Sequence, residues 1–135
     1  MEPPFTVELF IFPSGVGRLQ WHFSSDSKAI ALDLPARFVK VILLLQDAKD
    51  LDKNSEHIPP SLQGYRKADA IASLYDTVPP EPTTITRYLS DLCRTIARLQ
   101  GVPPLIERIP YRGAKLVCQL KTTYVEPQAH PEEES

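Results

Sequence analysis

The fold is decided by the stretch TTITRYLSDLCRTIARLQGVPP, which spans residues 83–104. Its apolar residues recur at alternating steps of four and three, which places them on one side of a helix: Ile85, Leu89, Leu92, Ile96 and Leu99. This spacing predicts a single amphipathic helix over residues 84–99. Thr83 or Thr84 is expected to cap its first turn by accepting a backbone N–H. Gly101 is expected to end it, because glycine readily adopts the left-handed conformation that closes a helix.

The polar face of this helix is rich in basic and hydroxyl side chains, namely Thr86, Arg87, Ser90, Asp91, Arg94 and Arg98. After the Gly-Val-Pro-Pro break, residues 105–120 have the pattern of a β-hairpin with Gly113 near its turn. The hairpin adds the cations Arg108, Arg112 and Lys115. A basic helix that is followed at once by a basic two-stranded ribbon is typical of a winged helix that contacts DNA.

The segments that precede this helix predict a small sheet and two further helices. Strand-like runs, rich in β-branched and aromatic residues, cover residues 5–12, 19–23 and 29–32. Residues 38–45 are apolar on nearly every side, which is typical of a central buried helix, and Asp33 is placed to cap it. A polar connection over residues 48–63 then leads to a shorter helix, expected over residues 67–75. The order of strands, helices and hairpin indicates an α+β fold.

The charge of the chain is unevenly distributed. The 135 residues carry a formal net charge of −2. Residues 1–80 hold eight Lys or Arg against ten Asp or Glu, a net of −2, whereas residues 81–121 hold seven against three, a net of +4. Residues 122–135 hold none against four, a net of −4. Basic charge is therefore concentrated in the predicted helix and hairpin, where a polyanion would bind.

The length of the chain is that of one domain, which we expect to span residues 1–121 and to be followed by an acidic, disordered tail over residues 122–135. No apolar run approaches the roughly 20 residues that cross a membrane, and the first residues lack the pattern of a secretory signal. Two cysteines are too few for a disulfide framework, so reduced thiols in a cytoplasmic protein are expected.

Residues that could support catalysis or bind a metal are not arranged for it in the sequence. His22, His57 and His130 are not spaced with one another or with cysteines as metal ligands. Cys93 and Cys118 fall beside predicted core positions, which is typical of small buried residues rather than of nucleophiles. No cofactor, metal or small-molecule substrate is therefore expected, and the sequence predicts no enzyme.

Three segments resemble the effector domain of OmpR/PhoB-type response regulators. ALDLPARFVKVILLL (31–45) resembles the strand that enters the first helix of the family, TTITRYLSDLCRTI (83–96) its recognition helix, and IERIPYRGAKL (106–116) its wing. Their order and spacing cover about residues 5–120. The resemblance implies a winged helix-turn-helix with an N-terminal antiparallel sheet, three helices and a C-terminal β-hairpin wing. The chain departs from the family at Ala114, where an aromatic residue is usual, and at Asp91, where a basic or neutral residue is favoured.

The resemblance implies sequence-specific binding of double-stranded DNA by a small transcription regulator, with the helix over residues 84–99 in the major groove. Thr86, Arg87 and Ser90 would then lie in the first turns of the helix inside the groove. Arginine can hold the O6 and N7 atoms of guanine together, and hydroxyl groups can reach bases or phosphates. Arg94 lies further along the helix and is expected to contact phosphate.

The predicted wing over residues 105–120 would contact the adjacent minor groove. Arg112 at the wing tip suits a narrow minor groove, which attracts arginine. Arg108 and Lys115 would neutralise phosphates and make the binding dependent on salt.

Two alternatives remain open at this point. Arg87, Asp91 and Arg94 are spaced to pair with one another, so they can form an ordinary solvated helix face. The chain can also be a winged-helix protein-interaction module without DNA binding, which its net acidity and its polar connection over residues 48–63 would fit. A protein partner or a homodimer remains open in both cases, and no membrane partner is expected.

Overall fold

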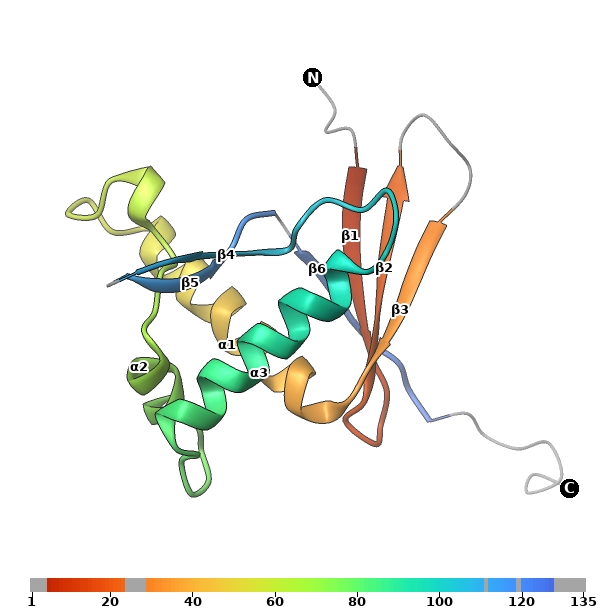
Figure 1. Ribbon diagram of the computed structural model, residues 1–135, viewed down its shortest axis with the longest axis horizontal. Coiled ribbons are helices and arrows are strands. Elements are labelled where there is room, and N and C mark those ends of the chain that lie inside the picture. The colour runs from red at the N-terminus through yellow and green to blue at the C-terminus, as the bar shows by residue number, and fades with distance from the viewer. Residues whose placement is uncertain (1–4, 24–28, 111, 119, 128–135) are drawn as a thin grey trace, which may run out of the picture.

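The computed structural model describes residues 5–23, 29–110, 112–118 and 120–127. Its elements, in chain order, are β1 (Phe5–Ile11), β2 (Gly17–Phe23), β3 (Ala29–Leu34), α1 (Ala36–Lys53), a 3-10 turn (Pro60–Leu62), α2 (Ala68–Ser73), α3 (Pro82–Ala97), β4 (Ile106–Ile109), β5 (Gly113–Leu116) and β6 (Leu120–Tyr124). Figure 1 shows the four-stranded sheet at one end of the molecule, α1 and α3 beside it, and the β4–β5 hairpin near α2 at the other end. The predicted α+β fold, with its sheet, three helices and hairpin in winged-helix order, is confirmed.

The three predicted N-terminal strands form an antiparallel sheet, which confirms that prediction, and a fourth strand that the sequence did not predict makes the complete sheet mixed. Its order is β3-β2-β1-β6, in which β1, β2 and β3 pair antiparallel and β6 pairs parallel to β1. Val7 lies opposite Leu120 in this pair, and both side chains are buried, which holds the last strand on the core. The ordered sheet therefore continues to Tyr124, three residues beyond the boundary expected at residue 121. Most of the expected disordered tail, residues 128–135, lies outside the described residues.

The core lies between the sheet and α1, as the apolar pattern of residues 38–45 predicts. Leu9, Leu19 and Trp21 point inward from β1 and β2 and are fully buried. Val41, Ile42 and Leu45 of α1 are equally inaccessible, which confirms a central helix with apolar residues on nearly every side.

Helix α1 is longer than predicted, because its buried face continues past the apolar run. Ala48 and Asp52 follow Leu45 at steps of three and four and are buried in turn. The helix therefore ends at Lys53, and the connection begins after it rather than at residue 48. A buried aspartate reads as polar in the sequence, which is why the prediction stopped early.

Helix α3 matches the predicted period but not the predicted caps. Its inward residues Ile85, Leu89, Leu92 and Ile96 are buried, and Leu99 packs against the core just after the helix. Pro82 occupies the first helical position, which places Thr83 and Thr84 inside the first turn, and no side chain caps the helix.

The predicted cap of α1 is wrong as well. The residue at its N-cap is Pro35, and Asp33 instead accepts a hydrogen bond of 2.7 Å from Arg18 Nε on the neighbouring strand. At both helices, a proline fixes the backbone of the entry and takes the place of a side-chain cap.

Candidate nucleic-acid interface

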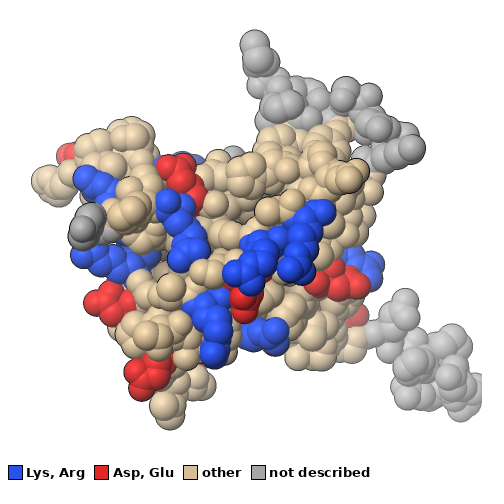
Figure 2. All heavy atoms as spheres, viewed as in Figure 1, with Lys and Arg blue, Asp and Glu red and all other residues tan. Residues whose placement is uncertain are grey.

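The exposed side of α3 carries a stripe of arginines. With about 100° between successive residues, Arg87, Arg94 and Arg98 fall opposite the buried stripe, and all three are exposed. They extend along about 16 Å of the helix at about 1.5 Å per residue. Figure 2 shows Lys and Arg side chains gathered over α3, with acidic side chains among them. We name Arg87, Arg94 and Arg98 the arginine stripe.

Asp91 interrupts this surface without neutralising it. Its carboxylate lies 3.6 Å from Arg94 Nη1, so one of the pairs expected for a solvated helix face is present. The expected pair between Asp91 and Arg87 does not occur among the described residues. Because an exposed pair contributes little free energy, Arg94 remains free to exchange this partner for a phosphate.

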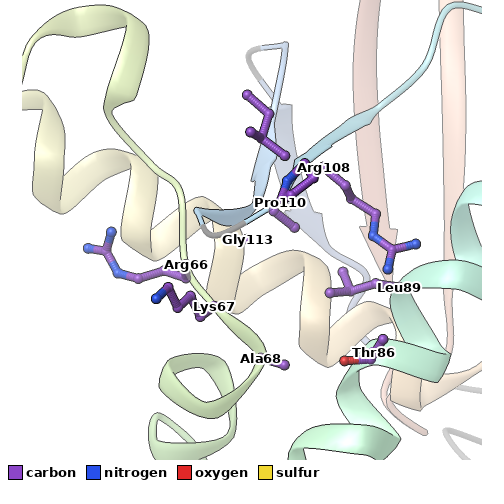
Figure 3. Close-up of a pocket in the computed structure, with 10 residues that line it drawn as sticks. Arg66, Lys67, Ala68, Thr86, Leu89, Arg108, Pro110 and Gly113 are labelled. Carbon is purple, nitrogen blue, oxygen red and sulfur yellow. The ribbon is translucent and has the colours of Figure 1, made fainter.

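The wing is joined to α3 by a hydrogen bond. Arg108 of β4 donates from Nη1 to Ser90 Oγ of α3 at 2.9 Å. Arg108 lies opposite Ala114 in the hairpin register, and Ala114 is buried, so this face of the hairpin is turned to the helices. Figure 3 shows the Arg108 side chain reaching from the wing toward Leu89 of α3. Two of the predicted residues, Ser90 and Arg108, are thus brought together.

Lys115 does not join this surface, although the sequence suggested that it would. In the register of β4 with β5, Lys115 lies opposite Glu107, one position away from the Arg108–Ala114 pair, so its side chain leaves the other face of the hairpin. There its Nζ atom donates to the Ser61 carbonyl at 3.2 Å and lies 4.7 Å from the centre of the Tyr65 ring.

Arg112 lies in the turn between β4 and β5 and is exposed, which agrees with the predicted position at the wing tip. Its backbone N–H donates to the Ile109 carbonyl at 3.2 Å, which ties the backbone of Arg112 to the end of β4.

An open cleft of about 530 Å³ is lined by the wing, the start of α2 and the first half of α3. Thr86 lines it from α3, and its hydroxyl donates to the Pro82 carbonyl of the same helix at 3.1 Å. Lys67 lines it from the residue before α2, and Arg108 lines it from the wing. In Figure 3 the Arg66 guanidinium lies on the side away from α3. Two cations therefore flank a space that is open to solvent.

Lys67 and Arg98 belong to this surface but were not among the predicted contact residues. Arg98 could have been assigned from helical spacing alone, because it follows Arg87 by eleven residues, about three turns. Lys67 has no comparable signal, since its position depends on how the start of α2 packs against the wing.

That packing depends on Gly113, the first residue of β5. The backbone N–H of Arg66 donates to the Ala114 carbonyl at 3.0 Å, and the N–H of Ala114 donates to the Arg66 carbonyl at 2.9 Å. Gly113 has φ of +99°, and a Cβ at this position would overlap the Arg66 carbonyl and lie 2.7 Å from Lys67 N. The absence of a side chain at Gly113 thus allows the wing and the start of α2 to come into contact.

Other reactive side chains do not form a second site in the described residues. No group of three His, Cys, Asp or Glu side chains there is close enough to hold a metal ion. Burial raises the pKa of the Cys93 and Cys118 thiols, which favours the unreactive protonated form. None of the helices in the described part of the chain has the length and apolar character needed to cross a membrane.

Comparison with known proteins gives one structural match. No protein-family model and no curated protein matches the sequence. A solved structure of the DNA-binding domain of E. coli CadC is similar, with 15% sequence identity, a TM-score of 0.39, and coverage of 74% of this chain and 79% of that chain.

Proposed function

We propose that this chain binds double-stranded DNA as the DNA-binding module of a transcription regulator. Helix α3 enters the major groove, and the wing lies along the adjacent minor groove. The observation that carries the proposal is the hydrogen bond of 2.9 Å from Arg108 to Ser90, because it joins the wing to the helix that bears the arginine stripe. The two basic elements thereby present one surface, of the kind that follows a duplex from one groove to the next.

The chemistry of the side chains assigns their roles. Arg87 lies in the first half of α3, is exposed and has no ion partner among the described residues, so it is free to read guanine in the major groove. Arg94 and Arg98 lie further along the same stripe and bind phosphates. Thr86 and Ser90 add hydroxyl groups on the side of α3 that faces the wing.

The wing side supplies the remaining contacts. Arg112 at its tip enters the minor groove, where a narrow A·T segment favours arginine. Arg108 and Lys67 lie on either side of the open cleft and bind phosphates of the strand that passes over it. Lys115 is not part of this interface, because it lies on the far face of the hairpin.

Titration of labelled duplex DNA at several salt concentrations tests the proposal. With phosphates bound by Lys67, Arg94, Arg98 and Arg108, the slope of log K against log salt is expected to be about −3.6, since each contact contributes about −0.9. Arg87→Ala is expected to lower the affinity for the best binding sequence about tenfold and to leave nonspecific binding almost unchanged. The absence of duplex binding at low salt would contradict the proposal.

A protein-docking module without DNA binding is the second candidate, because the loop before α3 exposes apolar side chains. Val78 is 89% exposed, and Leu74 at the end of α2 is 47% exposed. Contiguous exposed apolar patches mark protein contacts, so this candidate requires Leu74 and Val78 to share one docking surface. Recovery of a stoichiometric protein partner that Val78→Ser abolishes, together with no affinity for DNA, would favour this candidate.

A further inference from the structure

A partly buried ion pair connects the last turn of α1 to the segment that precedes α2. The Asp52 carboxylate accepts hydrogen bonds of 2.8 Å from both Nη1 and Nη2 of Arg66 and one of 2.7 Å from the Gly64 N–H. Asp52 is 5% exposed. A two-pronged pair of this kind fixes both the distance and the orientation of its partners. The pair therefore holds the backbone of Arg66 in one place relative to α1.

The same residue, Arg66, is bound to the wing through its backbone. Its N–H and C=O groups form the reciprocal hydrogen bonds with Ala114 described above. These hydrogen bonds make an isolated antiparallel β-bridge between Arg66 and β5. Ala114 is itself the register partner of Arg108, the wing residue that reaches α3. A continuous path thus runs from Asp52 through Arg66 and Ala114 to Arg108, the wing residue that is hydrogen-bonded to α3.

The other contacts of the far face of the wing lead to the same segment. Lys115 donates to the Ser61 carbonyl, and the Tyr65 hydroxyl donates to Glu107 Oε1 at 2.8 Å. Residues 61–66 therefore act as a clamp on the wing. Asp52 ties this clamp to α1 through the Arg66 side chain and the Gly64 N–H.

We infer that Asp52 and Arg66 are positioning residues for DNA binding. They contact no DNA themselves, but they hold the clamp against α1 and so fix the wing beside α3. Without the pair, the wing keeps its own residues and charges but loses its fixed place relative to the arginine stripe. This inference rests on the proposed function, since it concerns how the wing takes part in that interface.

A double-mutant comparison on DNA affinity tests the inference. Arg112→Ala is expected to lower the affinity about tenfold in the wild-type background, because it removes the contact at the wing tip. In the Asp52→Asn background the same change is expected to cost less than twofold, because the wing tip no longer reaches its groove. Two independent contributions would instead give the same factor in both backgrounds, and that result would overturn the inference.

Asp33→Asn is the matched control. It also replaces the carboxylate partner of an arginine, Arg18, but this pair joins two strands of the N-terminal sheet and is distant from the wing in the sequence. In this background Arg112→Ala is expected to retain its full effect. If Asp52→Asn does not fold, as judged by circular dichroism and Trp21 fluorescence, Arg66→Lys replaces it, because lysine keeps the charge and loses the two-pronged geometry.

Amide hydrogen exchange separates this inference from the proposed function. In Asp52→Asn the amides of Arg66 and Ala114 are expected to exchange at least tenfold faster, while that of Leu9 in the central sheet is unchanged. This measurement needs no DNA, so it tests whether Asp52 holds residues 61–66 against the wing even if the chain binds no duplex. Unchanged exchange at Arg66 and Ala114 would overturn the inference.

Discussion

Replacing Gly113 by alanine is expected to separate the wing from the start of α2. The residue has φ of +99°, and an added Cβ would overlap the Arg66 carbonyl oxygen and carbon. These are backbone atoms, so the overlap cannot be relieved by rotating a side chain. The wing must move away, and the two hydrogen bonds between Arg66 and Ala114 must lengthen or break.

The magnitude follows from these two effects. An alanine in the left-handed conformation costs roughly 1–2 kcal/mol. Each of the two lost backbone hydrogen bonds adds about 0.5–1.5 kcal/mol. Gly113→Ala is therefore expected to lower the free energy of unfolding by about 3 kcal/mol in a urea titration followed by Trp21 fluorescence.

Gly101→Ala is the matched control for this variant. Gly101 has φ of +81°, but a Cβ there would meet no atom within 4 Å. Gly101→Ala is expected to lower the free energy of unfolding by about 1 kcal/mol, because only the cost of the left-handed backbone conformation applies. If Gly113→Ala and Gly101→Ala lower the free energy of unfolding equally, the contact between the wing and Arg66 contributes nothing to stability, and the reasoning is refuted.

Three further predictions concern single charges. In fluorescence anisotropy titrations, Arg108→Ala is expected to weaken duplex binding about tenfold and to reduce the slope of log K against log salt by about 0.9. Lys115→Ala is expected to change the affinity less than twofold. Similar losses in both variants would show that both faces of the hairpin meet DNA. Asp91→Asn is expected to raise the affinity about threefold, because it removes a negative charge beside Arg94 and frees that guanidinium, and a lower affinity would show that Asp91 instead orients it. The hydrogen bonds from Arg66 hold the pKa of Asp52 below its ordinary value of 3.8. The stability that this carboxylate provides is therefore present above that pH and is lost as the pH falls through the lowered pKa. In urea titrations, the difference in the free energy of unfolding between the wild type and Asp52→Asn should shrink below about pH 4, and a difference that does not change with pH would contradict the assignment.

Local patterns in the sequence predict the elements well where one face of an element is buried. The stripe that begins at Ile85 repeats with the helical period, and the structure buries four of its five residues inside α3. The alternation of Leu19 and Trp21 likewise marks the inward face of β2. The helix starts were less predictable, because Pro35 and Pro82 set the backbone without the side-chain caps that the neighbouring Asp33 and Thr83 suggested.

Long-range features had no comparable signal. Nothing near Leu120 indicates that it pairs with Val7, because the partner strand lies more than a hundred residues away. The candidate site shows the same limit. Arg108 and Lys115 fall on opposite faces because Ile109 pairs with Gly113, and a register shifted by one residue would have placed them together.

The parallel pairing of β1 with β6 has a mechanical consequence. Because the two strands run in the same direction, a force applied through the chain before Phe5 and after Tyr124 pulls them along each other rather than apart sideways. The ladder from Val7–Leu120 to Ile11–Tyr124 then shares the load across all its hydrogen bonds at once, instead of opening one after another. When this domain is stretched by its two ends in an optical trap, it should therefore unfold in a single step at high force. The pairing of the first strand with the last strand would be its most force-resistant contact.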